Sequence, residues 1–186
     1  SEAQNWHVYH EGVHGSAPHN YVLVLNSNND RSSSSSAYWG GNAPTTTVMG
    51  VGNDNSSNKN GTSYVMYLFA EVEGFSRFSD YLSIFSTNGN YIHCGFRPQW
   101  LMIKAYAGVS DAGWIIYDDV RGTENPTTNH LFANYSNAET TNSNLYIDFL
   151  SNGFKIRGTN TNIGGGSDYY VFFAFARQDF RFSNAR

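Results

Sequence analysis

The chain has 186 residues, of which 40% are hydrophobic, 16% aromatic and 14% charged, and its formal net charge is −4. This length allows one sizeable core or two small ones, and the acidic balance gives no basic surface for nucleic acid. No run of about 18 apolar residues is present. We therefore expect neither nucleic acid nor a membrane as a partner.

An internal repeat organises the sequence. Trp6 in NWHVYHEGV matches Trp114 in GWIIYDDVRG at an offset of 108 residues, and FAE (69–71) matches FAR (175–177) at an offset of 106. Between them, YVLVLN corresponds to HLFAN and TVMGVGN to GFKIRGTN. Agreement in order at a nearly constant offset indicates two copies of one unit.

The first copy, residues 1–79, contains predicted strands at 5–13, 21–26, 47–53 and 64–70. In the last of these, apolar residues occupy both alternating faces, which is typical of a central strand covered on both sides. The copy has no counterpart of YLSIF, YIHCGF or WLMIKAY. We expect an incomplete β-sandwich whose open edges are covered by copies of the chain or by an adjacent protein.

The second copy, residues 80–186, contains a full set of about eight predicted strands. Asn88-Gly89 and Ser151-Asn152-Gly153 separate β-rich runs, which predicts two hairpins with two-residue turns. Residues 169–175 alternate as residues 64–70 do and predict a second central strand. The fold class is therefore all-β, with two related jelly-roll or β-sandwich units in tandem, the first lacking its N-terminal strands.

Four histidines near the N-terminus, His7, His10, His14 and His19, have a spacing that suggests a transition-metal site. On a strand, however, His7 and His10 point to opposite faces. The second copy has Ile and Asp at the matching positions. We therefore interpret these side chains as exposed loop and edge histidines.

Asp118, Asp119 and Glu124 lie around a Gly-containing turn and offer oxygen ligands for a structural calcium ion. The alternative is that adjacent Asp residues simply end a strand. No other cofactor is expected.

Glu71 and Glu73 have the spacing of two carboxylates on one face of a strand, as glycoside hydrolysis requires. In the second copy Arg177 stands in the place of Glu71, which favours salt-bridged edge residues. The sequence contains no Ser-His-Asp spacing, nucleophile elbow, phosphate-binding loop or dinucleotide fingerprint. We therefore predict that the protein is not an enzyme.

Tyr38 and Trp39, in SAYWGGN, are the candidate ligand-binding residues. An exposed Trp beside a Tyr offers a flat apolar face on which a sugar ring can stack. The alternative is core packing, because Trp39 matches Ile147 of the second copy, at a position that faces the predicted core.

The succession GFRPQWLMIK, WIIYDDVRG, FLSNGFKI and YYVFFAFARQDFRFSNAR resembles a repeat domain of bacteriophage tail-fibre and other virion surface proteins. WHVYHEGV, APTTTVMGVG and YLFAEVEGFSRF fit the same pattern in the first copy, except that His10-Glu11 replaces the Asp pair. That family is similar in architecture to concanavalin A-like or laminin G-like jelly rolls. The resemblance implies a structural or adhesive role on a virion surface or extracellular fibre, without a shared catalytic motif.

Two functions follow as hypotheses. The first is a non-enzymatic module that assembles into an oligomer or filament through contacts completing the first sandwich. The alternative is a lectin-like domain that binds a cell-surface carbohydrate or host receptor.

Overall fold

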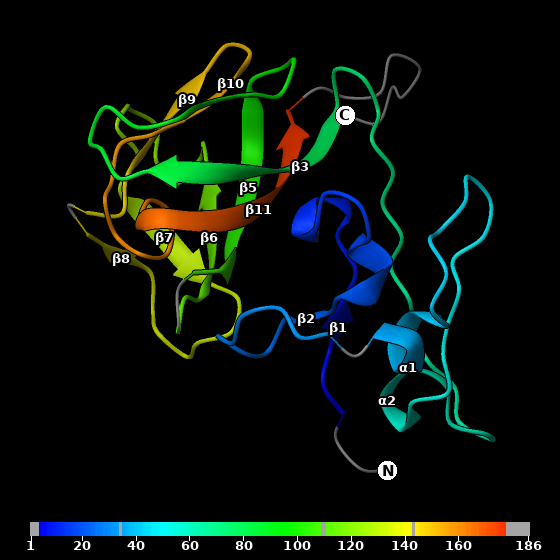
Figure 1. The fold of residues 1–186 in the computed structure, drawn as a ribbon. Coiled ribbons are helices and arrows are strands. Elements are labelled where there is room, and N and C mark those ends of the chain that lie inside the picture. The colour runs from blue at the N-terminus through cyan, green and yellow to red at the C-terminus, as the bar shows by residue number, and fades with distance from the viewer. Residues whose placement is uncertain (1–3, 34, 109–110, 143, 178–186) are drawn as a thin grey trace.

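A computed structural model describes residues 4–33, 35–108, 111–142 and 144–177 (Figure 1). Antiparallel strands dominate its regular structure, which confirms the all-β class. In chain order the elements are β1 (His7–Val8), η1 (Glu11–Val13), η2 (Pro18–Asn20), β2 (Leu23–Val24), α1 (Ser35–Trp39), α2 (Asn55–Asn58), β3 (Ser76–Ile84), β4 (Tyr91–His93), β5 (Pro98–Ala107), β6 (Trp114–Asp118), β7 (Asn129–Phe132), β8 (Thr140–Thr141), β9 (Ile147–Leu150), β10 (Gly153–Ile156) and β11 (Gly166–Ala176).

The second copy forms a sandwich of two sheets. Six strands in the order β3-β11-β5-β6-β7-β8 form one sheet, and three strands in the order β4-β10-β9 form the other. Leu101 and Ile103 from β5, with Tyr170 and Phe172 from β11, face Phe154 of the smaller sheet in one buried cluster. This cluster is the main hydrophobic core.

Strand β11 lies at the centre of the larger sheet, between β3 and β5. Tyr170 and Phe172 point into the main core, whereas Val171 and Phe173 point to the opposite, outer face. Both faces are covered, because side chains alternate along a strand and each set has its own cluster. The prediction of a central strand at residues 169–175 is therefore confirmed.

Part of the first copy covers the outer face of this sheet. Val13 and Leu23 are each 1% exposed and pack against Tyr106, Trp114 and Val171. Elements β1, η1 and β2 thus belong to the hydrophobic structure of the second copy, and the described residues of the first copy form no separate sandwich.

The ammonium group of Lys104 is buried between β5 and the N-terminal region. Its Nζ donates hydrogen bonds to the carbonyl oxygens of Asn28 (3.1 Å), Ala105 (2.6 Å) and Ala112 (2.9 Å). Burial lowers the pKa of Lys104 to about 8, although the negative charge of Asp30 opposes this. The three carbonyls satisfy the three donors of the ammonium group.

Of the two predicted hairpins, one is confirmed and one is wrong. Ser151-Asn152 connects β9 to β10, which pair directly in an antiparallel hairpin. Asn88-Gly89 instead connects β3 in the larger sheet to β4 in the smaller one. A side chain at Gly89 would place its Cβ 2.8 Å from the carbonyl oxygen of Ile156, so close approach of two backbones explains this glycine.

The predicted strand at residues 64–70 is also wrong, since these residues pair with no described strand. The described helices are single turns, and none is long and apolar enough to cross a membrane.

Replacing Phe154 by Ala is expected to lower the free energy of unfolding by about 3–5 kcal/mol, because the ring is fully buried and its loss leaves a cavity. Ile84→Ala is the control, since Ile84 is 59% exposed, and its effect should stay below about 1 kcal/mol. Urea unfolding followed by circular dichroism measures both. Equal losses would contradict the position of the core.

Candidate functional site

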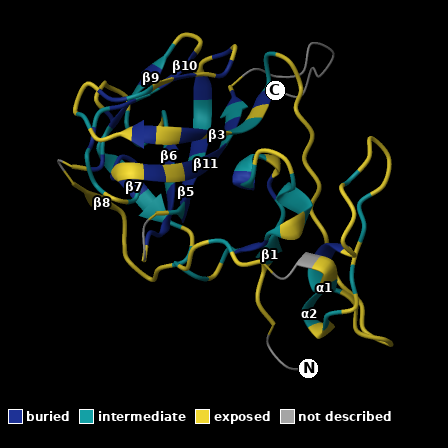
Figure 2. Ribbon diagram, viewed as in Figure 1, coloured by how far each residue is buried: buried dark blue, intermediate teal, exposed yellow. Residues whose placement is uncertain are grey.

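The most unusual surface of the described chain is residues 64–71, which we name the exposed segment. Its first six side chains are large and hydrophobic, and their exposed fractions range from 40% to 69%. No backbone-to-backbone hydrogen bond joins residues 63–71 to any described residue. In Figure 2 the segment forms a yellow ribbon that leads from α2 to β3.

Specific contacts fix the two ends of the exposed segment. The hydroxyl of Tyr64 accepts a hydrogen bond from the Lys59 N–H (3.1 Å) and donates one to the carbonyl of Asn55. Near the other end, the ring of Phe69 lies 5.7 Å from the ring of Phe175 on β11. The apolar middle is therefore held in place while its backbone groups face water.

The repeat is also present in the hydrogen bonds. The backbone N–H of Trp6 donates to the Asn26 side chain (3.0 Å), and that of Trp114 donates to the Asn134 side chain (2.9 Å). Strand pairing has the same offset of 108 residues. The matching pairs are His7↔Val24 with Ile115↔Phe132, and Val8↔Leu23 with Ile116↔Leu131. Strands β1 and β2 are thus the first-copy counterparts of β6 and β7.

The tyrosine at the start of the exposed segment follows the same rule at the offset of 106. Tyr170 accepts a hydrogen bond from the Gly165 N–H (2.9 Å) and donates one to the carbonyl of Thr161 (2.7 Å). Tyr64 makes the matching pair of bonds to Lys59 and Asn55. The exposed segment therefore begins as β11 does.

His10 contradicts the interpretation of the histidines as exposed residues. It is 3% exposed, its Nδ1 accepts a hydrogen bond from the Gly12 N–H (3.0 Å), and its Nε2 therefore donates to the carbonyl of Phe172 (3.1 Å). In the second copy, Asp118 accepts from the N–H of Val120 at the matching position. His10 takes over this turn-capping role and adds a bond to β11.

The other three histidines do not join His10 in a ligand set. His7 stacks on Tyr38 with ring centroids 4.2 Å apart, and His14 stacks on Tyr21 at 4.8 Å. Within the described ranges, no three His, Cys, Asp or Glu side chains gather closely enough to hold a metal ion.

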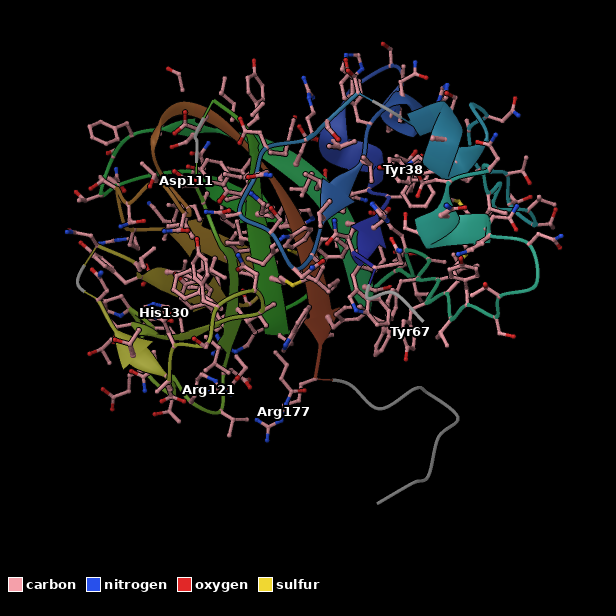
Figure 3. All side chains as sticks on the ribbon, turned by 90° about the horizontal axis from the view of Figure 1, so that it is seen from below. Tyr38, Tyr67, Asp111, Arg121, His130 and Arg177 are labelled. Atoms are coloured by element: carbon pink, nitrogen blue, oxygen red, sulfur yellow. The ribbon has the colours of Figure 1, made fainter. Side chains whose placement is uncertain are left out.

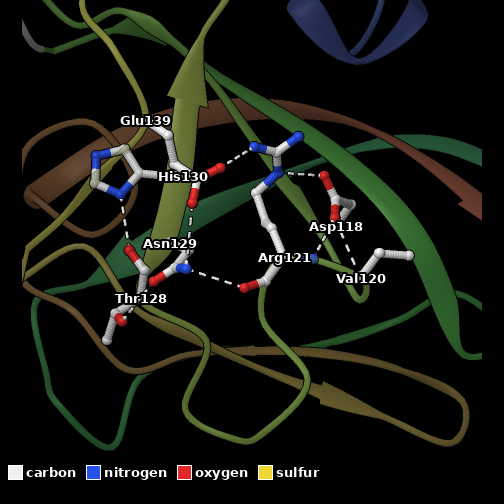
Figure 4. A network of polar contacts seen from close by, with 7 residues as sticks. All are labelled: Asp118, Val120, Arg121, Thr128, Asn129, His130 and Glu139. Atoms are coloured by element: carbon white, nitrogen blue, oxygen red, sulfur yellow. Dashed lines mark hydrogen bonds and ion pairs between the residues drawn. The ribbon is translucent and has the colours of Figure 1, made fainter.

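The candidate calcium residues are likewise engaged separately or exposed. Asp118 forms an ion pair with Arg121 and accepts hydrogen bonds from two backbone N–H groups (Figure 4). Burial opposes its ionisation, but the bonds from Arg121 outweigh this and hold the pKa of Asp118 below its usual value. Asp119 has a buried carboxylate oxygen without a hydrogen-bond partner, and Glu124 is exposed. This geometry does not assemble a calcium site.

Tyr38 and Trp39 lie in α1 and not on a strand facing a sheet. Trp39 is 5% exposed, donates its indole N–H to the carbonyl of Tyr21 (2.9 Å) and meets Tyr9 edge-on. Its ring is therefore covered by protein, which favours core packing over contact with a sugar. Figure 3 shows Tyr38 with Tyr67 in the N-terminal half of the molecule.

Glu71 is paired as the sequence suggested. One carboxylate oxygen lies 2.9 Å from a guanidinium nitrogen of Arg77, and the other accepts the N–H of Phe78 at 2.9 Å. This places Glu71 in an edge contact at the start of β3.

A shallow groove of about 500 Å³ lies on the outer face of the larger sheet, and sequence reasoning missed it. Arg121 bridges Asp118 and Glu139 along one side (Figure 4). The lining residues are Gln99, Trp100, Asp118, Val120, Arg121 and Glu139. The alternation of β5 carried the signal for Trp100, because Leu101 points into the main core and its neighbour must point outward.

Comparison with known families places this architecture. A family model described as a domain of unknown function, DUF7483, matches residues 1–179 and so spans both copies of the repeat. The chain belongs to the DUF7483 family. No curated protein and no solved structure matches it.

Acidification should destabilise the folded DUF7483 chain through His10. Unfolded His10 takes up a proton near pH 6.5, whereas burial lowers the pKa in the folded chain to about 4. Stability is therefore complete above pH 6.5 and falls as the pH drops toward 4, by up to about 3 kcal/mol.

Urea unfolding at a series of pH values measures this loss. His10→Gln retains a side-chain donor but cannot take up a proton, so its stability should fall less between pH 6.5 and 4. Parallel curves for the two proteins would show that His10 is not responsible.

Proposed function

We propose that this chain is a non-enzymatic structural module of a phage virion surface or tail fibre. It assembles with copies of itself or with an adjacent virion protein through the exposed segment. The observation that carries this proposal is the row of hydrophobic side chains at residues 64–69 without strand partners among the described residues.

The physical argument concerns both the backbone and the side chains of the segment. Unpaired N–H and C=O groups in an extended strand offer hydrogen bonds to another strand. The side chains of Val65, Tyr67 and Leu68, each at least 67% exposed, would leave water on pairing. Strand addition satisfies both sets of groups at once, as in other complexes that extend a β-sheet.

The resemblance to tail-fibre repeat domains supports the setting of this proposal. It rests on GFRPQWLMIK, WIIYDDVRG and the closing YYVFFAFAR in the second copy, with related words in the first. Such a module serves by its shape and contacts, and neither the paired Glu71 nor the paired Asp118 is arranged as a catalytic carboxylate pair.

The isolated chain is expected to self-associate, and Leu68→Asp should weaken this by about tenfold or more, because a carboxylate would be buried in an apolar contact. Val120→Asp is the matched control, since Val120 and Leu68 are both 68% exposed. Sedimentation velocity over a range of concentrations measures the effect. A wild-type chain that stays monomeric throughout would sink the proposal.

A second candidate function is adhesion through the groove beside Trp100. An indole ring next to Arg121 and two carboxylates offers a stacking surface and hydrogen-bonding groups for a sugar ring. The groove thus replaces Tyr38 and Trp39 as the place where a cell-surface glycan would bind.

If the groove binds glycans, Trp100→Ala should lower retention on a glycan array by about tenfold or more. Trp6→Ala is the control, because Trp6 is 53% exposed but lies outside the groove. Thermal unfolding of both variants checks that they remain folded. Equal retention of the wild type and Trp100→Ala would reject this candidate.

A further inference from the structure

The two copies of the repeat allow the partner of the exposed segment to be described in more detail. In the second copy, β5 lies between β11 and β6 and pairs with both. The first-copy counterparts of those neighbours are the exposed segment and β1. Among the described residues, β1 pairs only with β2, and the exposed segment pairs with nothing.

An aromatic contact shows that these counterparts have the relative placement of β11 and β6. The rings of Trp114 on β6 and Phe173 on β11 lie 6.2 Å apart on the outer face. The matching rings of Trp6 and Tyr67 lie 6.4 Å apart. Trp6 therefore stands to the exposed segment as Trp114 stands to β11, across the width that one strand occupies in the second copy.

Resting on the proposed function, we propose that the partner is a single β-strand of β5 chemistry, supplied by a neighbouring polypeptide and inserted between β1 and the exposed segment. It runs antiparallel to both, as β5 does, and its side chains are apolar on both faces. Its outward side includes one lysine at the position of Lys104, where the second copy buries an ammonium group among carbonyl oxygens.

The register follows from the pairing of the second copy. Tyr170, Phe172 and Ala174 lie opposite Ala105, Ile103 and Leu101 of β5. At the offset of 106, Tyr64, Met66 and Leu68 lie opposite the corresponding Ala, Ile and Leu of the partner. On the other side, Trp6 lies opposite the partner's lysine, because Trp114 pairs with Lys104.

The test uses a synthetic peptide with the sequence Gly95–Ala107, added to the complete chain. Hydrogen exchange read by mass spectrometry should slow by about tenfold or more at residues 64–71 and at β1, because their free N–H groups become bonded. A control peptide carries L101D and I103D, which place carboxylates opposite Leu68 and Met66. It should give no protection.

A second arm places a copy of Gly95–Gly108 directly ahead of Ser1, which reproduces the spacing between β5 and β6 in the second copy. Protection by the free peptide supports the inference. Protection by the fused strand alone would overturn supply by a neighbouring chain, and protection by neither would overturn the inference altogether.

These results are separable from the proposed function. A chain that self-associates through Leu68 but gains no protection from the peptide would retain the assembly role and reject this partner. A monomeric chain that the peptide protects would retain the strand site and reject assembly among copies.

Discussion

Both faces of β11 are apolar, and each must be covered for the larger sheet to be stable in water. The smaller sheet covers one face with Phe154 and its neighbours. The other face depends on the N-terminal region, where Val13 and Leu23 pack on Val171 and His10 binds the carbonyl of Phe172. This dependence makes the two copies of the repeat one hydrophobic structure, in agreement with a family match that spans both.

The exposed segment meets the opposite situation with almost the same sequence pattern. Its residues correspond to β11 at an offset of 106, yet they have no described strand on either side. A strand gains stability from its neighbours and not from its own composition, since backbone hydrogen bonds and cross-strand pairs form only between strands. The difference between the two copies is therefore one of environment, and it accounts for the assembly role that we propose.

Sequence reasoning predicted what depends on local pattern: the all-β class, the central position of β11 and the repeat itself. It failed where a residue's state depends on distant partners. The pattern at 64–70 predicted a strand without showing whether a neighbour exists, and Asn88-Gly89 predicted a hairpin where β3 and β4 separate into different sheets. The burial of Trp39 and the groove beside Trp100 depend likewise on how α1 and the turn at Arg121 fold back.

The hydroxyl contacts of Tyr64 have a consequence for the kinetics of strand addition. They hold one end of the exposed segment against residues 55–59 before any partner arrives. Ordering that end in advance reduces the conformational entropy lost on association. An incoming strand would therefore form its first backbone bonds beside Tyr64 and extend the ladder toward Glu71, so that docking has a preferred direction along the chain.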